Sequence, residues 1–151
     1  MKLYRIDKRQ WLPVSPDEAW TFFSAPGNLQ EITPDWLDFQ IESPLPERMY
    51  AGLIIEYRVQ VFPGIRVRWI TEITHIEENV FFIDEQRFGP YAFWHHQHHF
   101  LPVDDGVEIR DIVHYGMPFG PLGRLVRWLV IRGQLQEIFE FRYGELERRF
   151  R

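Results

Sequence analysis

Apolar and polar residues alternate over most of the chain between residues 38 and 117, in short runs that end at turn-forming residues. Alternation with a period of two is typical of strands with one buried face. The turns are marked by Pro63-Gly64, Glu78-Asn79, Gly89-Pro90 and Asp104-Asp105-Gly106. With a similar run near the start, the pattern predicts antiparallel strands at residues 3–12, 38–43, 53–62, 65–76, 80–88, 91–103 and 107–117.

Two kinds of helical segment accompany these strands. Residues 15–24 have the start of a helix, with Ser15 as the capping residue and Glu18 completing a capping box. A second short helix is predicted to begin at Asn28 and to be broken by Pro34. Helical periodicity returns in the last thirty or so residues. This order predicts an α+β fold, in which a curved sheet with the long helix on its concave side would leave a cavity.

Four of the six histidines lie within eight residues, FWHHQHHF, at 93–100. Alternate residues of a strand share a face. If the turn at Asp104-Asp105-Gly106 pairs Val103 with Gly106, His98 lies opposite Asp111. The face that we expect to point inward then holds Trp94, His96, His98, Phe100, Ile109, Asp111, Val113 and Tyr115. The outer face holds His95, His99, Arg110 and His114.

His96, His98 and Asp111 can be interpreted in three ways. They could be a buried hydrogen-bonded pair that satisfies only itself, polar contacts for a ligand, or a catalytic or metal site. A carboxylate beside a histidine fixes the tautomer and raises the basicity of the ring, as a general base requires. A metal would need a third ligand besides the two histidines, and Asp111 is the only nearby candidate. We expect no metal and no other cofactor.

The last helix has one clear apolar stripe, formed in its second half by Leu135, Ile138, Phe139, Tyr143 and Leu146. Extended backward on a straight helix, the stripe reaches Ile131 and Trp128. Other apolar residues then fall on the outer side, namely Leu122, Val126, Leu129 and Val130. Either the helix bends near Gly133 or a loop covers its first turn, or the first half exposes an apolar patch ringed by Arg124, Arg127 and Arg132. Such a patch could be a dimer contact or a peripheral membrane contact.

Composition narrows the functional classes. A chain of 151 residues is expected to form one domain, 1–151. The net charge of −5 gives no general attraction to nucleic acid, and the absence of cysteine excludes disulfides and thiolate zinc sites. No signal-peptide core and no stretch of 18 uncharged apolar residues occur, so we expect a cytoplasmic protein without a transmembrane segment. The aromatic share of 17% favours a core or cavity lined by rings.

Three motifs, in this order, resemble the SRPBCC superfamily, the START-like "helix-grip" group. They are NLQEITP at 28–34, GPYAFWHHQHHF at 89–100 and MPFGPLGRL at 117–125. The nearest resemblance is to a bacterial ligand-binding or polyketide-cyclase-like branch, and it covers essentially the whole chain. It implies two short helices after the first strand, and a curved antiparallel sheet around a long C-terminal helix and a hydrophobic cavity. By position, the branch motif falls on Trp94, His96, His98 and Phe100. The resemblance therefore implies where a site lies, but it does not imply a particular reaction.

The leading hypothesis is binding or transport of a small hydrophobic molecule, lipid-, polyketide- or aromatic-like, between the sheet and the C-terminal helix. An alternative is a polyketide cyclase or dehydratase with His96 or His98 as general base, oriented by Asp111. A third possibility is a protein–protein interaction module that acts through the C-terminal helix, as a monomer or a homodimer. The predicted ligand contacts are Trp69, Trp94, His96, His98, Phe100, Asp111, Tyr115, Phe139 and Tyr143.

Overall fold

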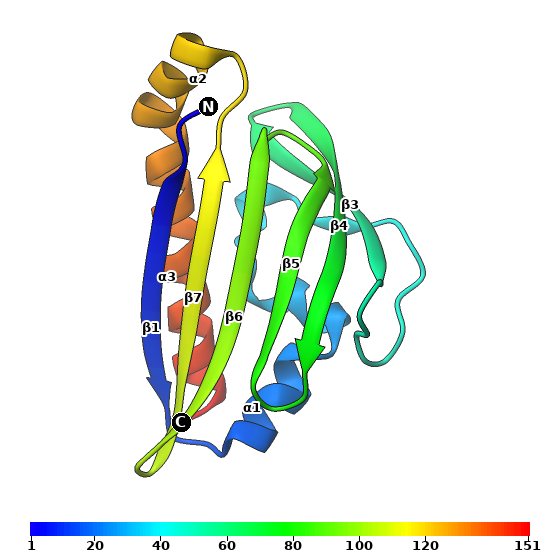
Figure 1. Cartoon of the computed structure of the whole chain (residues 1–151), viewed down its shortest axis with the longest axis vertical. Coiled ribbons are helices and arrows are strands. Elements are labelled where there is room, and N and C mark those ends of the chain that lie inside the picture. The colour runs from blue at the N-terminus through cyan, green and yellow to red at the C-terminus, as the bar shows by residue number, and fades with distance from the viewer.

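A curved antiparallel sheet of seven strands forms the body of the protein (Figure 1). The computed structural model describes residues 1–151. The strands are β1 (Tyr4–Leu12), β2 (Gln40–Ile41), β3 (Ile54–Phe62), β4 (Ile65–Glu77), β5 (Phe81–Phe88), β6 (Phe93–Val103) and β7 (Gly106–Gly116). Their order in the sheet is β1-β7-β6-β5-β4-β3-β2. All the strands expected from the alternation are present, although β2 has only two residues.

The register between β6 and β7 is the one that the turn residues predict. Val103 pairs with Gly106 across a two-residue turn, in which Asp105 has a left-handed φ of 61°. From there, His98 lies opposite Asp111, and His96 opposite Val113. Because one residue of slip would turn every side chain to the other face, this register places both histidines on the concave side.

The short helices after β1 differ in detail from the prediction. Helix α1 (Pro16–Phe23) begins as expected, with Ser15 Oγ accepting a hydrogen bond from the backbone N–H of Glu18 at 3.1 Å. The next helices, η1 (Pro26–Ile32) and η2 (Asp35–Leu37), are both 3₁₀. Asn28 does not cap η1. Its amide donates instead to the carbonyl of Phe22 at 2.9 Å, because the helix already starts at a proline two residues earlier.

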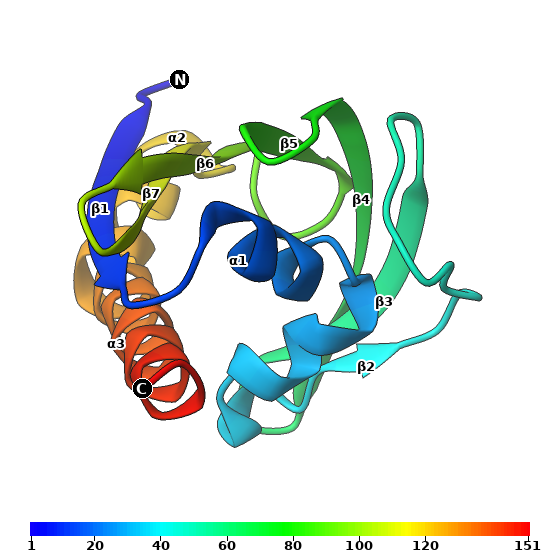
Figure 2. The same ribbon diagram turned by 90° about the horizontal axis from the view of Figure 1, so that it is seen from below.

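The C-terminal helix consists of α2 (Gly120–Val126), a π-helical segment η3 (Arg127–Ile131) and α3 (Arg132–Arg149). Gly133 lies within regular α3, so the irregularity comes before it and not at it. Figure 2 shows the sheet as an arch that runs from β1 through β7, β6, β5 and β4 to β3. Helix α3 lies on one side of the opening of this arch, and η1 and η2 lie on the other. None of the helices combines the length and the apolar character needed to cross a bilayer.

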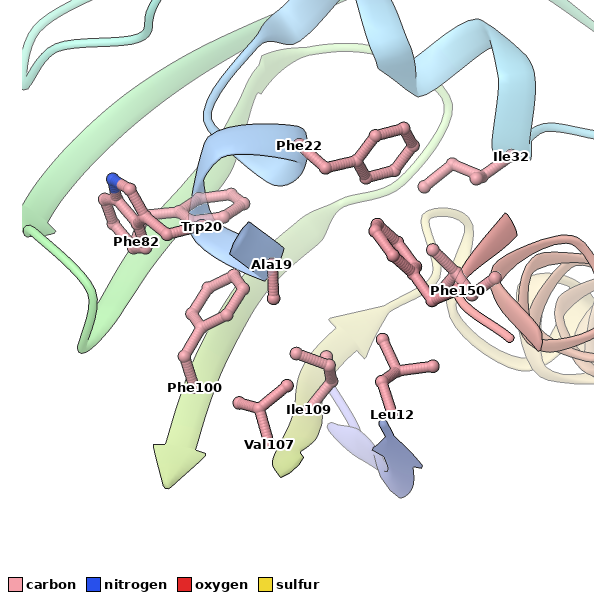
Figure 3. Packing of buried hydrophobic residues seen from close by; sticks show 11 residues of the cluster. Leu12, Ala19, Trp20, Phe22, Ile32, Phe82, Phe100, Val107, Ile109 and Phe150 are labelled. Atoms are coloured by element: carbon pink, nitrogen blue, oxygen red, sulfur yellow. The ribbon is translucent and has the colours of Figure 1, made fainter. Parts of the chain in front are cut away.

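One end of the arch is filled by packed side chains (Figure 3). Trp20 of α1 lies edge-on to Phe100 at a centroid distance of 5.1 Å and to Phe82 at 6.0 Å. Phe150, just after α3, lies edge-on to Phe22 at 5.5 Å. This cluster packs α1 and the end of α3 against the sheet, and it closes one end of the space between the sheet and α3. The predicted α+β helix-grip arrangement is confirmed.

Candidate functional site

A cavity of about 400 Å³ lies between the concave face of the sheet and the C-terminal helix. Of the 38 residues that line it, 26 are hydrophobic, so a molecule inside it would contact mainly apolar side chains. The walls come from β3 to β6, from α3, from η1 and η2, and from the loop before α2. Its volume falls in the range of small-molecule sites, about 300–1,000 Å³.

Charged side chains gather at one place in this apolar wall. Asp84 comes from β5, His96 and His98 from β6, and Arg142 from α3, and all four line the cavity. Asp111 of β7 lies directly behind them and is 1% exposed. We call these five residues the polar cluster. Pairing of β5 with β6 sets Asp84 opposite His96, which brings the second carboxylate to the histidines.

The two imidazole rings of the polar cluster stack between its two carboxylates. The ring centroids are 3.7 Å apart, with 26° between the planes. His96 donates from Nε2 to Asp111 Oδ1 at 2.8 Å, and its Nδ1 lies 3.7 Å from Asp84 Oδ2. His98 has the opposite orientation, since Nε2 donates to Asp84 Oδ2 at 2.5 Å and Nδ1 lies 3.4 Å from Asp111 Oδ1. Each ring therefore bridges both carboxylates.

The two histidines have different protonation behaviour. Burial lowers the pKa of His98, but hydrogen bonds with Asp111 and Asp84 outweigh it and raise the pKa above the ordinary 6.5. Burial also lowers the pKa of His96, and the charge of His98 adds to this effect, so the pKa of His96 stays below 6.5 despite its bond to Asp111. Within the polar cluster, protonation is therefore favoured on His98 over His96.

The carboxylates of the polar cluster remain ionised. Burial raises the pKa of Asp111, but hydrogen bonds from His96 and His98 hold it well below its usual range. For Asp84, burial is likewise outweighed, by the charge of His96 and the hydrogen bond from His98, and its pKa is lowered. When His98 is protonated, it and Arg142 balance the two carboxylates, and the polar cluster has no net charge.

Arg142 has hydrogen-bonding capacity left over. Its side chain comes from the buried stripe of α3, and the residue is only 8% exposed. Nη1 donates to Asp111 Oδ1 at 3.5 Å, a long contact, and the buried Nε–H has no partner. A guanidinium has five N–H donors, so this group can donate to an oxygen atom placed in the cavity.

The distances alone would also allow a metal. One ligand atom each from Asp84, His96 and His98 lies within 4.8 Å of the others. However, the nitrogen atoms are already used in hydrogen bonds, since His98 Nε2 donates to Asp84 Oδ2 at 2.5 Å and His96 Nε2 donates to Asp111 Oδ1 at 2.8 Å. A metal bound by Asp84 and His98 Nε2 would have to displace the proton of the hydrogen bond between them.

Five of the nine predicted ligand contacts line the cavity, namely Trp69, Trp94, His96, His98 and Phe139. The other four lie behind its wall. Phe100 packs in the cluster of Figure 3, and Asp111 lies beneath the histidines. Tyr115 stacks on Tyr4 at 5.4 Å, and its hydroxyl accepts from Arg127 Nε at 3.0 Å. Tyr143 has a buried hydroxyl without a partner. The strand faces are as predicted, but the curvature of the sheet brings only part of the concave face to the cavity.

Asp84 and Arg142 are not among the residues predicted from the sequence, although the sequence contains a signal for each. Asp84 alternates with Phe82 on β5, which places it on the concave face. Arg142 lies seven residues after Leu135 and four before Leu146, within the apolar stripe of the last helix. A charged residue at a buried position of an amphipathic helix indicates a buried partner or a ligand.

Comparison with known proteins adds information on the fold. No protein-family model matches the chain, and no curated protein matches its sequence. A solved structure from Thermus thermophilus matches with a TM-score of 0.67 and 22% identity, over 97% of each chain. One from Rhizobium loti has a TM-score of 0.69 and 14% identity, over 95% of this chain and 97% of that one.

A third match is norcoclaurine synthase from Thalictrum flavum, in complex with dopamine and hydroxybenzaldehyde. Its TM-score is 0.65 at 16% identity, over 95% of this chain and 86% of that one. The chain has the helix-grip fold. At these identities the similarity concerns the fold alone, and the bacterial branch indicated by the motifs stays a prediction.

Proposed function

We propose that the protein binds a small, mainly apolar molecule with one polar oxygen group. The observation that carries this proposal is an apolar cavity of about 400 Å³ whose wall contains one charge-balanced cluster of ionisable side chains. Apolar walls supply affinity by removing ligand surface from water, and a few fixed polar groups supply orientation. The apolar body would lie against Trp69, Trp94 and Phe139, with the oxygen group against the polar cluster.

The charge of the polar cluster favours a neutral polar group on the ligand. Protonated His98 and Arg142 together balance its two carboxylates. A ligand carboxylate would add a third negative charge at a buried site, which is costly unless His96 takes up a proton. A hydroxyl or carbonyl oxygen needs no such compensation. It could accept from Arg142, and a hydroxyl could also donate to Asp84 or to the free Nδ1 of His96.

Native mass spectrometry of gently purified protein, followed by extraction of the bound molecule, tests this proposal. We expect an organic mass on the wild-type protein and none on Val59→Trp, because Val59 is a buried residue of the cavity wall. Val80→Trp makes the same change at an exposed position outside the cavity and should retain the mass. A mass retained equally by Val59→Trp would place the binding site elsewhere and contradict the proposal.

A second candidate function is acid–base catalysis in the same cavity. The observation that favours it is a pair of stacked histidines in one wall, with the pKa of His96 lowered and that of His98 raised. Two groups whose environments separate their pKa values can act as base and acid. His96 could then remove a proton beside a carbonyl while His98 protonates a departing oxygen, as a cyclase or dehydratase requires. The norcoclaurine synthase match supports the view that this fold can contain an enzyme site.

The catalytic alternative is tested with the extracted molecule as substrate. If it is correct, His96→Asn should still bind that molecule but should no longer convert it. Turnover that is absent from the wild-type protein, or unchanged in His96→Asn, would leave binding as the function.

A further inference from the structure

Five large apolar side chains project into solvent at the start of the C-terminal helical segment. Their exposed fractions are 81% for Phe119, 63% for Leu122, 51% for Leu125, 65% for Trp128 and 62% for Leu129. We call this set the α2 patch. From Leu122 to Leu129 its members follow one another at helical spacing, so they form one continuous face. A contiguous apolar face of this kind indicates an interaction site.

The π-helical segment η3 adds Trp128 to this exposed face. On a regular helix, the buried stripe of α3 would continue through Ile131 to Trp128, and both would face inward. In the structure Ile131 is 7% exposed, whereas Trp128 is 65% exposed. The wider turn of η3, at residues 127–131, changes the helical register between them. Single-turn π-helical segments of this kind are frequent at functional sites.

The α2 patch has a basic surround in an otherwise acidic protein. The chain has a net charge of −5, yet no Asp or Glu occurs from residue 112 to residue 136. Arg124 and Arg132 are exposed within this segment and take part in no ion pair. Lys2 and Arg124 line one surface hollow together with Phe119. Figure 1 shows the N-terminus beside α2, at the same end of the molecule.

The α2 patch is also continuous with the mouth of the cavity. Phe119 and Leu122 are both highly exposed, and both line the cavity, as does the buried Gly123 between the first turns of α2. A surface that covers the α2 patch would therefore face the cavity opening. A small apolar molecule could then pass between that surface and the cavity without crossing bulk water.

We propose that the α2 patch docks the protein on the surface of an anionic membrane. Apolar side chains would enter the boundary between headgroups and acyl chains, while Arg124, Arg132 and Lys2 contact the anionic headgroups. A second copy of the chain fits this surface less well. A two-fold interface would bring the arginines of both copies together, and the segment has no carboxylate to neutralise them.

Co-sedimentation with vesicles tests the docking. We expect the protein to bind vesicles of equal parts phosphatidylcholine and phosphatidylglycerol, to bind pure phosphatidylcholine much more weakly, and to dissociate as salt is raised. Arg124→Gln with Arg132→Gln should weaken binding roughly thirtyfold, from the usual contribution of each basic residue near an anionic surface. Arg48→Gln, at an exposed arginine that also forms no ion pair, should leave binding unchanged. Equal binding to both kinds of vesicle, or no effect of the double variant, would overturn the proposal.

The apolar contribution has its own matched pair of variants. Trp128→Ser should weaken vesicle binding at least about tenfold. Trp11→Ser removes a tryptophan that is 52% exposed on β1 and should not change it. Analytical ultracentrifugation of the same proteins tests whether the α2 patch is instead a contact between two copies of the chain. A wild-type dimer that does not bind vesicles, and that Trp128→Ser converts to a monomer, would overturn the proposal. Val59→Trp should still bind vesicles, so a failure of docking and a failure of ligand binding are distinguishable.

Discussion

The substitution Asp111→Asn tests the charge balance of the polar cluster. Asp111 is 1% exposed, accepts from His96 at 2.8 Å, and lies 3.4 Å from His98 and 3.5 Å from Arg142. The amide oxygen of asparagine can still accept the hydrogen bond from His96. The change therefore removes mainly the negative charge, and leaves two positive groups facing the single carboxylate of Asp84.

We expect a large loss of stability. Removing one partner from a buried group of paired charges costs about 3–5 kcal/mol. That is a substantial part of the about 5–15 kcal/mol that stabilises a typical domain. His98 can relieve part of the imbalance by releasing its proton, so its pKa should fall in the variant.

Urea unfolding and NMR titration of the histidines measure these two effects. Asp7→Asn is the matched control, because Asp7 accepts from Arg110 at 2.7 and 2.9 Å but lies at the surface. Its substitution should cost only a small fraction of the loss at Asp111. If Asp111→Asn lowered the free energy of unfolding by less than about 1 kcal/mol, or left the titration of His98 unchanged, the charge-balanced pairing would be wrong.

Four further predictions concern pH dependence, a helix cap and two glycines. Because the pKa of His98 is raised in the folded state, its stabilising contribution should be complete below pH 6.5 and should decline as pH rises through the folded pKa. The difference in unfolding free energy between wild type and His98→Gln should thus shrink as pH rises through the folded pKa of His98. A difference that grows with pH would contradict a raised pKa for His98. Ser15→Ala should lower the unfolding free energy by about 1 kcal/mol in urea melts, since it removes the cap of α1. Gly123→Ala should destabilise by about 1–3 kcal/mol, because its Cβ would overlap the backbone oxygen of Pro118. In Gly133→Ala the Cβ would meet nothing within 4 Å, so thermal melts should show a gain of about 0.5–1 kcal/mol.

The parts of the fold that could be predicted from sequence are those determined by local rules. The two-residue turn at Asp104-Asp105 fixes the register of β6 against β7, and this alone pairs His98 with Asp111. Turn residues and alternation similarly predict the other strands. The Ser15 cap follows from spacing within one helical turn.

The parts that could not be predicted depend on less regular geometry. The connection from β5 to β6 runs through Gly89-Pro90 without a two-residue turn, and the pairing of β4 with β5 contains register shifts. The pairing of Asp84 with His96 could therefore not be predicted from the sequence. The π-helical segment η3 could not be predicted from the sequence either, because a change of helical register depends on what the flanking helices pack against. The sequence is therefore compatible both with a bend at Gly133 and with an exposed patch.

The central claim is that the cavity accommodates an apolar molecule, and titration with N-phenyl-1-naphthylamine tests it most directly. This neutral probe fluoresces when it enters an apolar site. We predict saturable binding of one probe per chain to the wild-type protein. Binding should be lost in Val59→Trp, from the sheet side, and in Ile138→Trp, from the helix side, but kept in Val80→Trp. Absence of saturable binding to the wild-type protein, or equal binding to both filled variants, would contradict the account.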